Sequence, residues 1–503
     1  MINSIRPLNY LALLCLLGLA NCSLTPVNVY TPQAPAANWI EPLPSNQAHA
    51  GKLGDLRNWW QQFNDPLLLQ LIEAAQKVSP DIETANARVV AAQAALNVSN
   101  ARLLPSVNGE ASASRNKNSL LFPAGTVANI GAKASWELDV FGKNKADTQQ
   151  KQAQLSGTNA LWHEARVIVA AQTATLYINY RLCENLSLVS KQNAASTLET
   201  ARLTKLSVNA GFLADDRGNQ ALATAAEATS QHKKQLLQCT LLVKSLVALS
   251  AMAEAELQAA LAKPHALTPM PAGIEVTAIP ANLLQQRPDV LNAERNVAAA
   301  SFEITVNEAQ RYPRLSLAGN IGLGYDSTTR SFAFGGRTPQ STGMTWSIGP
   351  VAVSLPIFDA GVRAANLVAA KAQYAAAKTS YESVARNAVR EVEEALAQLN
   401  SNSERVNDVN QSAAGYRLSL AATKLRYQND LANLFELEEA RRANLQAQTN
   451  VYVLNNERAL AWVALYRAMG GGWNLALNSP LLIFDHTLKH TAPDNLETKQ
   501  PVR

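Results

Sequence analysis

The sequence predicts a mainly α-helical chain with two β-hairpins, built from two structural repeats of helix, β-hairpin and long helical hairpin. Two proline-free tracts, 142–263 and 361–466, are far longer than a helix of a globular domain, so each must fold back on itself. Short alternating segments rich in small residues follow Pro105 and Pro313 and indicate strands. Both prolines follow an earlier proline at the same spacing, which indicates an internal repeat.

Composition excludes some classes of partner and anchor. The chain has 503 residues, 17% of them charged, and its formal net charge is +5. That charge is small for this length and forms no basic block, so nucleic acid has no electrostatic support as a partner. After residue 22, no stretch approaches the length of apolar sequence that a transmembrane helix needs.

The N-terminus reads as a secretory signal of a lipoprotein over residues 1–21. An apolar run, 8–20, is too short to span a bilayer and precedes Cys22. Leu19-Ala20-Asn21-Cys22 resembles a bacterial lipobox, in which the cysteine is acylated and anchors the protein in outer-membrane lipid. The alternative is an ordinary signal peptide with a chance cysteine. Residues 22–57 are proline-rich and predict an extended linker.

Helical composition begins at residue 58 and ends at Pro105. Gly211 and the Gln428–Asp430 cluster are the turn signals at which the two long tracts are expected to reverse. The sequence thus divides into two repeats and a C-terminal tail, 474–503. The first repeat, 58–270, has a β-hairpin at about 105–141 and a helical hairpin at about 142–262. The second repeat, 271–473, has a β-hairpin at about 313–358 and a helical hairpin at about 360–470.

The strands argue for oligomerisation. Two hairpins supply four strands, too few to close a membrane barrel, and an unpaired strand edge is not tolerated in lipid. Three copies would supply twelve. The helix expected from about 143 to 209 would be roughly 100 Å long at 1.5 Å per residue, which suits a distance to be spanned rather than a compact core.

Several motifs, in order along residues 59–473, resemble the TolC-like outer-membrane factor family, specifically its lipoprotein efflux-channel branch. They are Trp59-Trp60-x-x-Phe63-x-Asp65-Pro66, Trp136-Glu137-Leu138-Asp139-x-Phe141-Gly142, Leu284-x-x-Arg287-Pro288-Asp289, Leu355-Pro356-Ile357-Phe358-Asp359, Arg390-Glu391-Val392-Glu393 and Gly470-Gly471-Gly472-Trp473. The resemblance implies a homotrimer with a twelve-stranded outer-membrane β-barrel above a periplasmic α-helical barrel. It also implies a passive duct that exports drugs or other toxic small molecules, together with a periplasmic adaptor protein and an inner-membrane RND-type pump.

The same resemblance assigns a periplasmic gate to the helical turns. Tyr427 matches a tyrosine before the second turn, and Glu436 and Glu439 match two acids after it, which would form rings of carboxylates that attract cations. Ala432 stands where some relatives carry a basic residue that holds the gate shut. The alternative for the two acids is a solvated helix start, where the N-terminal dipole favours acids.

At the first turn the resemblance implies an altered latch. Arg217, after Asp215 and Asp216, stands where many relatives have an acid, so it is expected to pair with an acid of a neighbouring hairpin. Plain solvated turn charges are the alternative for these three residues.

Cys183 and Cys239 are equally far in sequence from Gly211, so they are expected to face each other across the first helical hairpin. In an oxidising compartment such cysteines can form a disulfide, the alternative being two buried free thiols. The histidines show no metal-ligand spacing, and we predict no metal, no cofactor and no catalytic constellation.

Two other functions compete with efflux. The first keeps the fold and serves as the outer-membrane duct of a one-step protein secretion system. The second, from a different class, is a non-pore periplasmic coiled-coil adaptor lipoprotein, which would have no reason for duplicated strand segments after Pro105 and Pro313.

Overall fold

The computed structural model describes residues 59–117, 124–263, 287–327 and 341–471. The expected signal peptide, Cys22, the linker and the C-terminal tail lie outside the described residues. The elements are η1 (Trp59–Phe63), α3 (Pro66–Val78), α4 (Pro80–Ala101), β1 (Ser106–Asn116), β2 (Gly125–Leu138), α5 (Lys143–Asn209), α6 (Asp215–Ser250), α7 (Glu254–Leu261), α8 (Pro288–Ala309), β3 (Arg314–Asp326), β4 (Ser341–Ser354), α9 (Val362–Gln428) and α10 (Leu434–Ala468).

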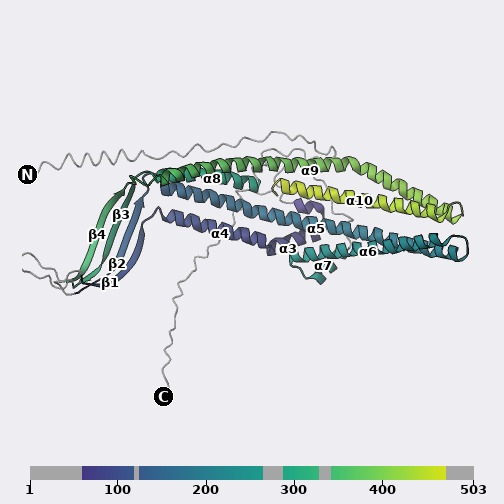
Figure 1. Cartoon of the computed structure of the whole chain (residues 1–503), viewed down its shortest axis with the longest axis horizontal. Coiled ribbons are helices and arrows are strands. Elements are labelled where there is room, and N and C mark those ends of the chain that lie inside the picture. Colours follow the sequence, from purple (N-terminus) through teal and green to yellow (C-terminus); the bar gives the residue numbers. More distant parts are fainter. Residues whose placement is uncertain (1–58, 118–123, 264–286, 328–340, 472–503) are drawn as a thin grey trace, which may run out of the picture.

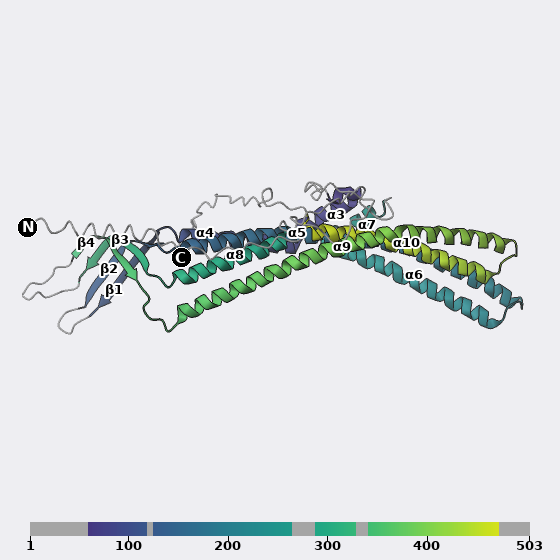
Figure 2. The same cartoon turned by 90° about the horizontal axis from the view of Figure 1, so that it is seen from above.

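The molecule is elongated, with the sheet at one end and the turns of both helical hairpins at the other (Figure 1). The helices run between these ends along the long axis. A view from above places the short helices α3 and α7 on one side of the long helices, near the middle of the molecule (Figure 2). This middle region, the sheet and the helical turns are therefore three separate places at which function could reside.

The two halves repeat each other element by element. Helices α4 and α8 both have 22 residues and begin at a proline, whose fixed φ suits the first helical position. Helices α5 and α9 both have 67 residues, which corresponds to roughly 100 Å. The two predicted fold-backs lie between α5 and α6 and between α9 and α10. The expected mainly helical fold of two repeats is therefore confirmed.

The four strands form one antiparallel sheet in the order β1-β2-β3-β4, and the β2–β3 pairing joins the two repeats. Strand β2 ends at Leu138, three residues before the expected end at Phe141, because the side chain of Asp139 caps the start of the next helix, α5. Its carboxylate accepts hydrogen bonds from the backbone N–H groups of Asn144 and Lys145 at the start of α5. Asp359 does the same for α9, so the second strand pair also ends earlier than expected.

The main hydrophobic core lies where η1 and α3 pack on the middle of the long helices. The ring of Trp59 is 6.0 Å from that of Trp462, and the ring of Trp60 is 4.6 Å from that of Tyr466. Gly471 closes this region with a φ of 69°, and a Cβ there would collide with Val167. The Trp-Trp motif and the glycine-rich motif, far apart in sequence, thus build one site of packing.

Within the described residues, no single helix has both the length and the apolar character to cross a membrane. Helices α6 and α7 satisfy this test only as a pair, and they are bent by 120° relative to each other.

Candidate functional site

The candidate site is formed by the turns of the two helical hairpins, which end the molecule opposite the sheet (Figure 1). The first turn uses Gly211 at φ 76°, a left-handed conformation that glycine adopts without strain. The N–H of Phe212 donates to the carbonyl of Ser207 at 2.8 Å, which is the 6→1 hydrogen bond of a Schellman motif at the end of α5. Helix α6 then begins with the exposed Asp215 and Asp216 in its first turn, where acids interact favourably with the helix dipole.

The second turn has the same geometry with a different sequence. Asp430 takes the left-handed position at φ 59°, and its N–H donates to the carbonyl of Tyr427 at 3.2 Å. The N–H of Leu431 donates to the carbonyl of Arg426 at 2.8 Å. Tyr427 is half-buried in the last turn of α9. Both hairpins therefore reverse at the predicted positions, and both turns combine a residue in the left-handed conformation with a 6→1 backbone hydrogen bond.

Glu436 is held by its own hairpin. It forms a capping box with Asn433, whose side chain accepts from the Glu436 N–H at 2.9 Å. Its carboxylate also lies 3.3 Å from Arg426, which donates in addition to the carbonyl of Leu431 at 3.0 Å. Arg426 was not among the expected gate residues, although its place just before Tyr427 offered a signal.

The other acids of this turn are paired as well. Glu439, with a side chain 74% exposed, forms an ion pair with Arg442 at 2.6 Å. Glu438 binds Arg441, and Arg441 donates to Ser196 of α5 at 2.7 Å. This second contact ties the two helical hairpins together near their turns.

Arg217 connects the two turns through an aromatic ring rather than through an acid. Its guanidinium carbon lies 5.7 Å from the centre of the Phe435 ring, at the start of α10. Its Nη1 also donates to Gln220 at 3.4 Å. Within the described part of this chain Arg217 has no acid partner, and its pairing with an acid of a neighbouring hairpin stays a prediction.

Charge at the second turn is balanced rather than acidic. The segment 424–442 contains four basic and four acidic residues, so its formal net charge is zero. Glu436 and Glu439, for which the resemblance implied rings of carboxylates, each have an arginine within 3.3 Å. These ion pairs all lie within the second hairpin, so they fix the charges of that turn, whereas Arg441–Ser196 and Arg217–Phe435 connect it to the first hairpin.

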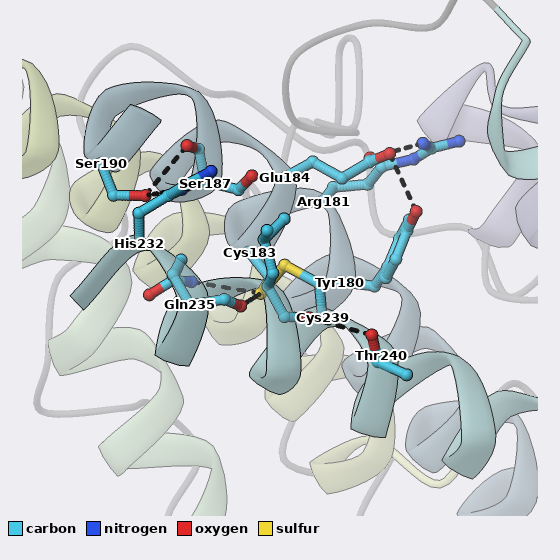
Figure 3. The surroundings of a disulfide bond; sticks show 11 residues. Tyr180, Arg181, Cys183, Glu184, Ser187, Ser190, His232, Gln235, Cys239 and Thr240 are labelled. Carbon is cyan, nitrogen blue, oxygen red and sulfur yellow. Dashed lines mark hydrogen bonds and ion pairs between the residues drawn. A yellow bond between two sulfur atoms is a disulfide. The ribbon is translucent and has the colours of Figure 1, made fainter. Parts of the chain in front are cut away.

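The cysteines of the first hairpin are joined across α5 and α6 (Figure 3). The Cα atoms of Cys183 and Cys239 are 5.5 Å apart, and their sulfurs form a disulfide bond. Gln235 donates to the sulfur of Cys183 at 3.2 Å, and His232 is hydrogen-bonded to Ser190 about two helical turns nearer the tip than the disulfide. The bond lies roughly 40 Å from the first turn, at 1.5 Å per residue of α5. No group of residues suited to a metal ion occurs in the described ranges.

Comparison with known families assigns the fold. The family model described as Outer membrane efflux protein matches residues 71–262 and 279–471, once over each repeat. The chain therefore belongs to the outer membrane efflux protein family.

Individual relatives agree with this assignment. The chain is 26% identical over 481 residues to the solvent efflux pump outer membrane protein SrpC of Pseudomonas putida, covering 93% of this chain and 99% of that protein. Its fold is similar to that of the outer-membrane channel OprN, with a TM-score of 0.75, 25% identity, and 89% and 99% of the two chains covered. The CmeC outer membrane channel of Campylobacter jejuni gives a TM-score of 0.76 at 23% identity, with 91% and 96% covered. The protein is thus an outer-membrane component of an efflux system.

Proposed function

We propose that three copies of this chain form a passive duct, with a shared β-barrel in the outer membrane and a helical barrel reaching through the periplasm. Small toxic molecules would leave the cell through it. The sheet supports this proposal most directly, because β1 and β4 each have one neighbour in a four-stranded sheet and so retain an unpaired edge. Pairing β4 of one copy with β1 of the next removes these edges.

The two faces of the sheet differ in polarity, as a barrel wall between lipid and water requires. Met344 and Trp346 are 69% and 70% exposed, although they are large and apolar. They continue apolar cross-strand rows, one of which runs through Ala111, Ile130, Leu323 and Met344. The opposite face carries polar rows, one of which runs through Asn108, Lys133, Asn320 and Ser347. This polarity is the observation that carries the proposal.

The helical turns would close the periplasmic end. In a trimer, Tyr427, Glu436 and Glu439 of each copy would surround one aperture, with Asp215, Asp216 and Arg217 on the adjacent hairpins. The contacts between the two hairpins, Arg441 with Ser196 and Arg217 with Phe435, would then hold the closed form. A periplasmic adaptor and an inner-membrane RND-type pump would supply the opening force and the energy, and acylated Cys22 would add a lipid anchor.

Native mass spectrometry of the protein extracted in mild detergent tests the assembly. We expect a trimer whose subunits begin at Cys22 and carry the mass of a lipid. A trimer without lipid would retain the duct and remove the anchor, whereas a water-soluble monomer would contradict the duct and favour the non-pore adaptor.

A matched pair of sheet variants tests the membrane face. Trp346→Asp should abolish assembly in the outer membrane, because it places a charge on the lipid side of the strand. Ser347→Asp, one residue on and on the polar face, should still assemble and conduct in a planar bilayer. Equal behaviour of the two variants would contradict the assigned orientation of the sheet.

A further inference from the structure

In the second repeat, a buried arginine fills the junction between three helices. The Arg287 side chain is 7% exposed and donates from Nη1 to the carbonyl of Ala468, at the end of α10, at 2.7 Å. It makes a two-pronged contact with Asp289, at 3.0 and 2.7 Å, and donates to Glu391 of α9 at 2.9 Å. The guanidinium thus satisfies two carboxylates and a helix C-terminal carbonyl at once.

The first repeat has the same junction without the arginine. Because α4 and α8 have equal lengths, Ser79 and Asp81 correspond to Arg287 and Asp289. The equal lengths of α5 and α9 likewise pair Gln172 with Glu391. Leu249 near the end of α6 corresponds to Ala468 near the end of α10, since the two helices begin at equivalent positions after their turns.

These corresponding positions line a cavity of about 830 Å³. Ser79, Asp81, Gln172 and Leu249 all border it. The serine is too short to take the place of an arginine, and its hydroxyl already accepts from the N–H of Ile82 at 3.4 Å, which caps α4. Asp81 is exposed in the first turn of α4, and within the part of the chain that the structure describes its carboxylate has no hydrogen-bond or ion-pair partner.

The rest of the lining is mostly apolar. It includes Ile168, Leu176, Leu460 and Val463, from α5 and α10. The lining therefore includes the exposed carboxylate of Asp81, the exposed amide of Gln172 and the last turn of α6 at Leu249, beside hydrocarbon walls. The last turn of α6 carries partial negative charge and, with the Asp81 carboxylate, favours a cation, whereas the N-terminus of α4 at Ser79 carries partial positive charge and opposes it.

We propose that this cavity is a binding site for an organic cation with a guanidinium head and an apolar body. The head would take the place that Arg287 occupies in the second repeat, with Asp81 as its counter-charge. Arg467, an exposed residue, also borders the cavity, and its charge opposes the ligand. Glu164 is the acid that interacts with Arg467 and offsets part of that opposition. The inference concerns binding and does not depend on which compounds are exported.

Isothermal titration of the full-length protein, held in amphipol without free detergent, tests the site. Hexylguanidinium is the probe, and hexylurea, of the same shape without charge, is its control. We expect saturable binding of hexylguanidinium at one site per chain and none of hexylurea at the same concentrations. Equal binding of both would reduce the site to an apolar groove, and no binding of hexylguanidinium would overturn the proposal.

Three variants distinguish binding of the probe in this cavity from its nonspecific binding elsewhere on the protein. Asp81→Asn should weaken binding at least about tenfold, because a charge-assisted hydrogen bond is lost. Glu83→Gln removes an exposed acid of the same helix turn that does not line the cavity, and should leave binding unchanged. Ser79→Arg supplies a guanidinium from the chain itself and should abolish binding while raising the melting temperature. Unaltered affinity in both Asp81→Asn and Ser79→Arg would place the probe elsewhere.

Discussion

The guanidinium of Arg426 lies 3.3 Å from the carboxylate of Glu436 and so joins the end of α9 to the start of α10. Arg426 also donates to the carbonyl of Leu431 within the turn, so one side chain holds both the turn and the acid. A gate built from Glu436 therefore includes its arginine, and the charge that an ion meets at the aperture depends on whether the pair is intact.

Ion selectivity tests this pairing. Arg426→Gln should raise the preference of the pore for cations, because it leaves Glu436 uncompensated, and Glu436→Gln with Glu439→Gln should lower it. Both side chains of the pair are about half exposed, so stability should change by less than about 1 kcal/mol. Reversal potentials in a planar bilayer under a salt gradient measure the change. Shifts of the same sign in both variants would contradict the pairing.

The contact between Arg217 and Phe435 is the second link at the tips. A cation over a ring at an exposed site contributes on the order of 0.5–1 kcal/mol, so its loss should favour separated hairpins. We expect Phe435→Leu to increase the open fraction of single channels. Arg217→Gln should have the same effect, and the double variant should add little to either. Additive effects in this double-mutant cycle would mean that the two residues act independently.

Much of this architecture follows from local sequence signals. The proline-free tracts, the prolines at the starts of α4 and α8 and the turn signals at Gly211 and Asp430 each depend on residues close together in the chain. The facing positions of Cys183 and Cys239 follow once the first turn is placed, because both helices have the same rise per residue.

The contacts that sequence did not reveal depend on side chains from different elements. Arg217 packs on Phe435 because α6 and α10 meet at their starts, which no local pattern encodes. The end of β2 at Leu138 reflects the use of Asp139 as a cap for α5. The balanced charge of the second turn was visible in composition, but the choice of partners was not.

Stability of the first helical hairpin should depend on the oxidation state of its cysteines. The bridge closes a loop with a sequence separation of 56, and such links typically stabilise by about 2–4 kcal/mol. Cys183→Ser with Cys239→Ser should therefore lower the melting temperature. Wild-type protein in reductant should fall to the value of the double variant, while the variant itself should not respond to reductant. A reductant effect on the variant would point to a cause other than this bond.

Glu164 should destabilise the folded protein at neutral pH. Burial raises the pKa of its carboxyl above 4.5, and the nearby Asp289 adds to this effect. The folded state then binds the proton more tightly than the unfolded state, so stability falls as pH rises from 4.5 through the raised pKa. Glu164→Gln should raise the melting temperature at pH 7, and the gain should disappear below pH 4.5. The same change at the exposed Glu227 serves as control. A gain that persists in acid would exclude ionisation as its cause.

Loss of Arg287 should be among the most damaging single changes outside the apolar core. Arg287→Gln leaves Asp289, Glu391 and the carbonyl of Ala468 without their shared donor, and breaking a buried ion pair from one side costs about 3 kcal/mol or more. The matched control is Arg390→Gln on α9, whose ion pair with Glu394 is more than half exposed and should contribute under about 0.5 kcal/mol. Thermal unfolding of the detergent-extracted protein compares the two. Equal shifts would mean that the junction at Arg287 relaxes without cost, and would also remove the structural template for a cation site in the first repeat.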